Sequence, residues 1–293
     1  MKTIKYIHRK TGKIEIESPP GESYLKFLYH NPFGQIPLNL LIKRKILSTV
    51  YGKLMNLSKS QEKIKPFIEQ FNINMNDSLK SINEFVSFND FFYRKLKPNA
   101  REIHDGLVSP ADGKIIAFEN INGVNEFFVK GNKFTLLDFL QDKQLAEKYK
   151  NSSLFIIRLA PNDYHRFHFP YSGNISNSHR IRGKYFSVSP YALRKSFSKV
   201  FCENKRDYSI LTTNSKGNIL ISPVGATMVG TIIETYHPNS IVKKGDEMGY
   251  FAFGGSSVLI LIDKDKVKID ADILENTKKG LETSIVMGEK FGE

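Results

Sequence analysis

Residues 249–262 read GYFAFGGSSVLILI and place four small residues, Gly254 to Ser257, between two apolar runs. Each run has the composition of a buried β-strand. A strand that breaks at paired glycines can bring its backbone close to another group. On its own, this stretch is more typical of a Gly-Gly turn with two ordinary serines than of a reactive site. Residues elsewhere in the chain are needed to choose between a turn and a reactive site.

Length and composition indicate a globular protein. The 293 residues can bury a full core, as one large domain or as one domain with a helical appendage. Hydrophobic residues make up 40% and charged residues 25%, which is not a disordered composition. Cys202 is the single cysteine, which excludes a disulfide framework or a cysteine-based metal cluster and fits a reducing location. We expect no signal peptide, because residues 1–5 lack an apolar region, and no transmembrane helix, because the longest uncharged run, 218–233, is typical of sheet.

The chain is strongly basic, with a net charge of +13, and this favours an acidic partner such as nucleic acid, an anionic membrane or an anionic substrate. Residues 1–60 contain 11 Lys or Arg and 3 Asp or Glu, so +8 of the excess is local. A local excess favours a docking surface over general solubility.

A basic amphipathic helix is predicted at residues 38–57, where apolar residues recur at steps of three and four. Lys43, Arg44, Lys45 and Lys53 fall mostly off the apolar face. Such a helix can lie in a membrane interface with its lysines against anionic headgroups. It can equally pack on its own domain with a solvated basic face, and the sequence leaves both alternatives open.

The rest of the N-terminal region is predicted to be irregular or helical. Residues 1–37 contain aromatics and prolines with little periodicity and are predicted to form an irregular arm. Residues 60–71 are predicted to form a second helix. Ser87 begins a capping-box pattern ahead of the aromatic residues 91–94, which are expected to be core.

From about residue 108, short β-rich runs alternate with turn signals. The runs 208–213 and 218–224 are predicted to form a hairpin, and helical patterns return at 136–149 and 190–199. The sequence therefore predicts an α+β fold. A helical, membrane-facing N-terminal region at residues 1–100 precedes a mainly antiparallel β domain at residues 101–293.

Two further stretches contain residues suited to chemistry. Residues 109–116 read SPADGKII, and a turn there would hold Asp112 rigidly enough to orient a histidine, although an ordinary turn aspartate is the simpler interpretation. Residues 159–170 read LAPNDYHRFHFP, a cluster too polar to be explained by packing at a strand end. Its His165 and His168 could ligate a metal, but no third ligand has suitable spacing. General acid–base chemistry is the stronger interpretation.

These stretches can be combined into one reaction. A serine after Gly-Gly presents its hydroxyl to the preceding carbonyl, because Gly255 has no side chain to shield the peptide. With a histidine as base and an aspartate to orient it, Ser256 could attack the Gly255 carbonyl. The N-to-O acyl shift would produce an ester, and elimination at Ser256 would then break the chain.

Together, the three stretches resemble the phosphatidylserine decarboxylase family, and the similarity extends from about Phe88 to Ile262. Each motif alone is weakly specific, but their order and spacing are highly specific. Residues before about 80 match only in helical, membrane-facing character. Four more segments contribute to the resemblance: FNDFFYR at 88–94, KYFSV at 184–188, VGATMVG at 224–230 and KGDEMGYF at 244–251.

The resemblance implies decarboxylation of phosphatidylserine to phosphatidylethanolamine and CO₂, in phospholipid biosynthesis. Asp112, His168 and Ser256 would be a self-processing triad that cleaves between Gly255 and Ser256 into a large chain, 1–255, and a small chain, 256–293. Ser256 would become a covalent pyruvoyl group, the electron sink that forms a Schiff base with the substrate amine, and no metal is expected. His165 would act during decarboxylation.

The resemblance also implies partners and a location. Phosphatidylserine and an anionic membrane surface are the expected partners, the two chains of the precursor would stay together, and a homodimer is left open. The expected location is the cytoplasmic face of a bacterial-type cell membrane, as a peripheral protein. Nucleic acid is not expected, because no recognised binding motif accompanies the basic excess.

This chain departs from many bacterial members at the cleavage site, where Gly-Gly-Ser-Ser replaces Leu-Gly-Ser-Thr. It is similar to the Gly-Gly-Ser form found in part of the family. The adjacent Ser257 raises the question of which hydroxyl reacts. Ser256 is favoured because it directly follows the glycines.

Other classes of protein fit less well. A serine hydrolase built on Ser256, His168 and Asp112 would need a Gly-x-Ser-x-Gly elbow, which is absent. A biotin or lipoate carrier domain would present a lysine at the hairpin tip, where this chain has Gly-Gly-Ser-Ser. A carrier and a nucleic-acid binder both predict an intact chain.

Overall fold

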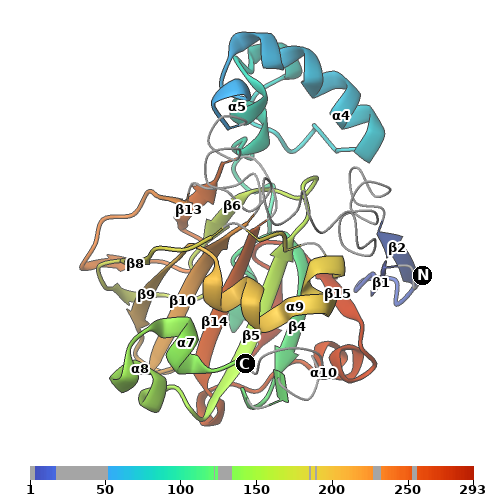
Figure 1. The fold of residues 1–293 in the computed structure, drawn as a ribbon. Coiled ribbons are helices and arrows are strands. Elements are labelled where there is room, and N and C mark those ends of the chain that lie inside the picture. Colours follow the sequence, from blue (N-terminus) through green and yellow to red (C-terminus); the bar gives the residue numbers. More distant parts are fainter. Residues whose placement is uncertain are drawn as a thin grey trace, which may run out of the picture.

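The computed structural model describes residues 4–17, 52–121, 123–124, 134–184, 186–188, 190–226, 232–252 and 256–293. Within these ranges the chain forms a large twisted sheet with helices on its faces, and a helical unit at one end (Figure 1). The predicted α+β class, with a mainly antiparallel sheet and a few short helices, is confirmed.

The central element is an 11-stranded sheet in which β14 (Ser256–Asp263) lies in the interior. On one side β14 pairs with β10 (Asn218–Gly225) and on the other with β5 (Ser152–Leu159), both antiparallel. The only parallel pair given among the described strands is β1 with β15. In spatial order the sheet runs β12 (Ser240–Val242), β7 (Gly173–Ile175), β9 (Arg206–Thr212), β10, β14, β5, β4 (Gly113–Phe118), β15 (Glu282–Ile285), β1 (Ile4–Ile7) and β2 (Ile14–Glu17), with β8 (His179–Ile181) paired to β9.

Two smaller sheets complete the β structure. One contains β11 (Ile232–Glu234), β13 (Glu247–Phe251) and β6 (Arg166–His168), with β13 in the middle. The other pairs β16 (Lys290–Gly292) with β3 (Leu107–Val108). Because β13 belongs to the small sheet and β14 to the large one, the Gly-Gly-Ser-Ser stretch connects two sheets. Both of its flanking runs are strands, as the sequence predicted.

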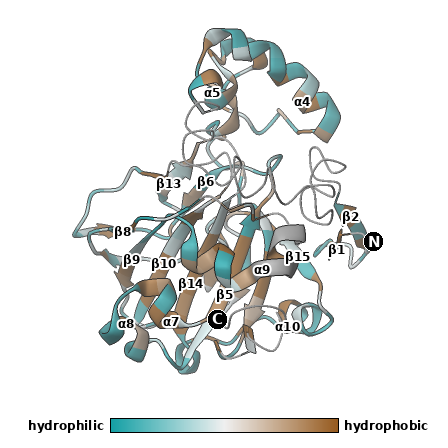
Figure 2. Ribbon diagram, viewed as in Figure 1, coloured by the Kyte–Doolittle hydropathy of each residue, from teal (hydrophilic) through white to brown (hydrophobic). Residues whose placement is uncertain are grey.

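The core lies on both faces of the large sheet. In β14, Leu259 and Leu261 pack into the cluster on the face covered by α7 (Leu136–Leu140) and α9 (Pro190–Glu203), beside α8 (Lys143–Lys148) (Figure 1). Its Val258, Ile260 and Ile262 pack into the cluster that contains residues of β6, β13 and α10 (Ala271–Lys278). Burial on both faces explains why this run is continuously apolar instead of alternating. Figure 2 shows apolar residues concentrated in the middle strands of the sheet.

The helical unit at residues 52–100 contains η2 (Ser58–Lys63), α4 (Ile64–Phe71), η3 (Ile82–Glu84) and α5 (Phe88–Phe92). The predicted helix at 60–71 is confirmed as η2 followed by α4. Ser87 is the N-cap of α5 and its side chain accepts from the Asp90 nitrogen at 3.2 Å, as the capping pattern predicted. The aromatics of α5 are buried in the core of this unit.

Two expectations differ from the structure. Residues 4–17 are not an irregular arm, because β1 and β2 form a hairpin that extends the large sheet beyond β15. The helical pattern at 136–149 is broken at Gln141, whose φ of 53° ends α7, and Asp142 then caps α8. The predictions at 190–199 and for the hairpin of β9 and β10 are confirmed.

Most of the predicted basic helix, including Lys43, Arg44 and Lys45, lies outside the described residues. Among the residues that are described, no helix combines the length and apolar character needed to cross a membrane.

Candidate active site

Ser256 is the first residue of β14 and is completely buried. It pairs with Leu159 of β5 on one side and with Gly225 of β10 on the other. Its hydroxyl, like that of Ser257, has no hydrogen-bond partner among the residues that the structure describes. A buried hydroxyl without a partner is unusual enough to need an explanation, and a reactive role is one.

The two serines point to opposite faces of the sheet, because side chains alternate along a strand. Ser256 shares the face of Val258, whose cluster includes Phe167 and Phe169 on either side of His168. Ser257 shares the face of Leu259, toward α9. Alternation therefore aims Ser256, and not Ser257, toward the layer that contains β6, and the same alternation turns the His168 side chain to the side of β6 opposite Phe167.

His168 ends β6, opposite Glu247 of β13, and its ring is held by two hydrogen bonds. Nδ1 lies 2.9 Å from the Gly245 carbonyl oxygen, so Nδ1 must donate. In the neutral ring Nε2 is then the acceptor, and it takes a hydrogen bond from the Tyr164 hydroxyl at 3.2 Å. Burial lowers the pKa of His168, against smaller raising effects of the Gly245 bond and the charges of Glu247 and Asp112. The ring is therefore a neutral base near pH 7.

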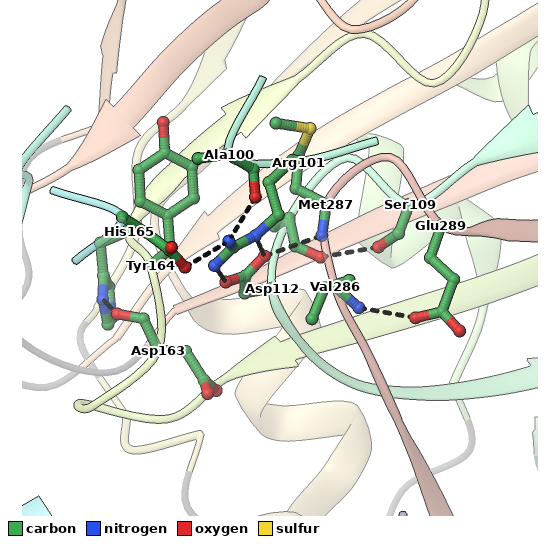
Figure 3. Close-up of polar contacts among 12 residues, drawn as sticks. Ala100, Arg101, Ser109, Asp112, Asp163, Tyr164, His165, Val286, Met287 and Glu289 are labelled. Carbon is green, nitrogen blue, oxygen red and sulfur yellow. Dashed lines mark hydrogen bonds and ion pairs between the residues drawn. The ribbon is translucent and has the colours of Figure 1, made fainter. Parts of the chain in front are cut away.

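Asp112 lies just before β4 and is buried. Its carboxylate accepts from Arg101 at 3.2 Å (Nε) and 2.7 Å (Nη2), and from the Met287 backbone nitrogen at 2.7 Å. Figure 3 shows this arrangement, with the Arg101 guanidinium lying against the carboxylate. A second carboxylate, that of Asp77, contacts Arg101 at 3.0 Å.

The predicted direct contact between Asp112 and His168 is not among the hydrogen bonds of the described residues. The two are linked through the backbone, because the His168 nitrogen donates to the Pro110 carbonyl at 2.8 Å, two residues before Asp112. Asp112 also acts on the imidazole through its charge, which raises the His168 pKa. Gly245 and Tyr164, and not Asp112, set the orientation of the ring.

Strand order brings the three predicted residues to one end of the large sheet. β4, β5 and β14 are consecutive, so the β4 and β14 backbones lie about 10 Å apart at the usual strand spacing. β5 ends at Leu159, beside Ser256, and the chain then passes through residues 160–165 into β6 and His168. The Asp163 carboxylate fixes this connection by accepting from the Ala160 nitrogen at 2.7 Å and pairing with Lys114 at 3.1 Å.

His165 lies beside the segment that leads to the cleavage stretch. Its carbonyl accepts from the Phe251 nitrogen at 2.9 Å, at the end of β13 and five residues before Ser256. Its Nδ1 donates to the Asp163 carbonyl at 2.8 Å, and its ring lies 3.9 Å from that of Phe92, centroid to centroid. The side chain is completely buried.

Sequence reasoning did not single out Arg101 or Tyr164. Tyr164 is within the cluster at 159–170, but nothing in the spacing shows that its hydroxyl reaches His168. Arg101 follows the aromatic helix with no motif of its own in the sequence. Among the described residues, no three His, Cys, Asp or Glu side chains are grouped to hold a metal ion.

Comparison with known proteins identifies the family of the chain. The family model described as phosphatidylserine decarboxylase matches residues 88–293. A protein of Fusobacterium nucleatum named phosphatidylserine decarboxylase proenzyme is 54% identical over 292 residues, covering 99% of this chain and 97% of that protein. Proteins of the same name from Clostridium tetani and Desulfitobacterium hafniense are 48% and 47% identical, each over 99% of this chain and 98% of its own length. The chain belongs to the phosphatidylserine decarboxylase family.

Proposed function

We propose that this chain is the proenzyme of a pyruvoyl-dependent phosphatidylserine decarboxylase, which converts phosphatidylserine to phosphatidylethanolamine and CO₂. Family membership over the full length supports the activity. The structural observation that carries the proposal is the buried hydroxyl of Ser256, which has no hydrogen-bond partner among the described residues and stands at the start of β14, directly after Gly255 in the sequence. A serine placed there fits the precursor of a pyruvoyl group.

The self-cleavage begins when the Ser256 hydroxyl attacks the Gly255 carbonyl carbon. Collapse of the tetrahedral adduct breaks the peptide C–N bond and leaves an ester between Gly255 and the Ser256 oxygen, with a free amine on Ser256. Removal of the Ser256 α-proton then expels the Gly255 carboxylate and leaves a dehydroalanine at residue 256. Its imine tautomer takes up water and releases ammonia, which leaves a pyruvoyl group on the small chain, 256–293.

His168 is the base for this sequence. Its Nδ1 proton is committed to the Gly245 carbonyl, so the Nε2 lone pair is the position that takes up a proton. Tyr164 donates to that lone pair and holds the ring in place. Asp112 favours the protonated form of His168 through its charge, and Arg101 together with the Met287 nitrogen keeps the carboxylate in position.

In the mature enzyme, residue 256 would hold the pyruvoyl group, whose carbonyl would supply the electron sink that decarboxylation of an amine substrate requires. His165 serves the decarboxylation step: because its Nδ1 proton is committed to the Asp163 carbonyl, Nε2 is the atom that takes up a proton and passes it on. Its fixed Nδ1 bond to Asp163 and its contact with Phe92 hold the ring beside the segment that precedes residue 256.

Access to a lipid substrate requires contact with a membrane surface, and we place this contact in the N-terminal region. Residues 54–86 supply five of the large apolar side chains that are exposed in the described residues: Leu54, Leu57, Leu79, Ile82 and Val86. The basic residues 43–45 would add attraction to anionic lipid, on the order of 1 kcal/mol each near the surface. A peripheral position on the cytoplasmic face of the cell membrane fits this arrangement.

The function is tested with purified protein expressed without added protease. Wild-type protein should separate into two fragments under denaturing conditions and should release CO₂ from phosphatidylserine. Ser256→Ala should stay intact and inactive, whereas Ser257→Ala, the matched control, should still cleave. An intact wild-type chain that decarboxylates, or a cleaved Ser256→Ala variant, would contradict the proposal.

The membrane contact is tested separately by flotation with vesicles that contain anionic lipid. A variant with Lys43, Arg44 and Lys45 changed to glutamine should float less than wild type, and added salt should reduce the difference. Equal flotation of the two proteins at low salt would contradict a basic docking surface.

A further inference from the structure

Arg94 is a buried arginine without an anionic partner in the described part of the chain. It follows α5 and is 7% exposed. Its guanidinium lies over the Phe91 ring, 5.0 Å from the centroid. Its Nε is buried without a hydrogen-bond partner, and no ion pair joins the side chain to any residue that the structure describes.

The other buried arginines of the described chain all have partners. Arg158 pairs with Glu17 and Glu282, and Arg166 pairs with Glu247 and donates to the Tyr93 carbonyl. Arg206 donates to three backbone carbonyls. A buried guanidinium is costly unless it is paired, so Arg94 is the exception that needs an external anion to explain it.

Arg94 lies at the candidate active site. Two residues before it, Phe92 contacts the ring of His165. The adjacent Tyr93 carbonyl accepts from Arg166, the residue that follows His165. Burial lowers the pKa of Arg94, and the charged or ionisable groups that act on it are Asp112, Tyr164, Arg101 and Asp163, two of which are the predicted site residue Asp112 and the His168 partner Tyr164.

We propose that Arg94 binds the phosphodiester group of the phospholipid substrate. This inference rests on the proposed decarboxylase function. The substrate brings two anions, a phosphodiester and a carboxylate, and an arginine can bind either through paired N–H groups.

The phosphodiester is the better match because its charge is unchanged by the reaction. The carboxylate leaves as neutral CO₂, so a cation held against it would stabilise the substrate more than the transition state and oppose the chemistry. A cation on the phosphodiester binds substrate and transition state equally, and its removal should raise KM with little change in kcat.

The test uses Arg94→Met and Arg94→Lys, with Arg182→Met as the matched control because Arg182 is exposed. The substrate is dihexanoyl phosphatidylserine in monomeric solution, which separates headgroup binding from membrane binding. Arg94→Met should still self-cleave and should show KM raised about 10- to 100-fold, the usual effect of losing a hydrogen bond to a charged group. The kcat of Arg94→Met should stay within a few-fold of wild type. The KM of Arg94→Lys should lie between those of wild type and Arg94→Met, and the KM and kcat of Arg182→Met should equal those of wild type.

Two soluble inhibitors distinguish the anions, since both contain a primary amine. Glycerophosphoethanolamine has the phosphodiester without the carboxylate, and L-serine has the carboxylate without the phosphodiester. Arg94→Met should weaken inhibition by glycerophosphoethanolamine by the same factor as KM and leave inhibition by L-serine unchanged. The reverse result would assign Arg94 to the carboxylate and overturn the inference.

Thermal unfolding separates binding from a purely structural role. Removal of an unpaired buried charge should leave the Tm of the processed enzyme equal to or above that of wild type. A lower Tm with unchanged KM in both Arg94 variants would show that the arginine supports the fold and would overturn the inference. If wild-type protein decarboxylates phosphatidylserine while Arg94→Met keeps the wild-type KM, the inference fails and the proposed function stands.

Discussion

The two histidines of residues 165–168 are expected to act in different reactions, and a matched pair of substitutions can separate them. In both rings Nδ1 donates to a backbone carbonyl, His165 to Asp163 at 2.8 Å and His168 to Gly245 at 2.9 Å. An asparagine amide can supply the same donor near the position of Nδ1. His165→Asn and His168→Asn therefore keep the anchoring bond and remove the rest of the imidazole.

The size of the effect follows from what each change removes. His168→Asn eliminates the Nε2 lone pair, and general base catalysis contributes about 10²- to 10⁴-fold, so self-cleavage should slow by about that factor. It also leaves the buried Tyr164 hydroxyl without its acceptor, which should lower the free energy of unfolding by about 1–3 kcal/mol. His165→Asn should cleave at nearly the wild-type rate, yet the processed enzyme should lose most of its decarboxylase activity.

The assay follows the fraction of uncleaved chain with time after synthesis in a cell-free translation system, by denaturing electrophoresis. Decarboxylation is then measured on the processed fraction as CO₂ release. Wild-type cleavage by His168→Asn would refute its assignment as the base. Equal loss of cleavage in both variants would refute the division of roles between the two histidines.

Three further predictions concern the same site and its support. Tyr164→Phe removes one of the two hydrogen bonds that hold the His168 ring, so cleavage should slow about 2- to 10-fold in the same time course. Faster cleavage would contradict this and show that the Tyr164 hydroxyl blocks Nε2 of His168. Burial lowers the pKa of His168 below its usual 6.5, so the ring stays neutral at neutral pH. The wild-type cleavage rate should therefore be constant above about pH 6.5 and fall only at lower pH. A rate that still rises between pH 7 and 9 would contradict a lowered His168 pKa. Arg158→Met leaves the partly buried carboxylates of Glu17, in the N-terminal hairpin, and Glu282, in the small chain, without their shared cation. Urea unfolding followed by circular dichroism at pH 7 should show a loss of about 2–4 kcal/mol. Lys150→Met, which breaks an exposed pair with Glu147, is the control and should change stability by no more than about 0.5 kcal/mol, and similar losses in the two variants would contradict the reasoning.

Local sequence patterns were sufficient to predict those helices and strands whose formation depends mainly on residues within the element itself. The continuously apolar run in β14 indicated a buried strand, and Ser87 indicated the start of α5. The turn residues between β9 and β10 indicated a hairpin. In each case the signal lies within about ten residues, where chain geometry alone limits the alternatives.

The features that sequence patterns did not predict depend on contacts between residues that are far apart in the sequence. The hairpin of β1 and β2 consists of two four-residue strands, too short for their alternation to stand out, and it depends on pairing with β15 near the other end of the chain. The orientation of His168 depends on the Gly245 carbonyl, 77 residues away in sequence. Residue types and spacing could suggest an Asp, a His and a Ser for the site, but not that Arg101 would hold Asp112 or that Tyr164 would contact His168.

The mass of the small chain tests the central claim most directly. If Ser256 cleaves the chain and becomes a pyruvoyl group, mass spectrometry of the denatured protein should show a fragment of residues 256–293 that is lighter than the unmodified peptide by one ammonia. Its N-terminus should also resist sequential degradation. A fragment with an unmodified N-terminal Ser256, or with an N-terminus at any other residue, would contradict the account.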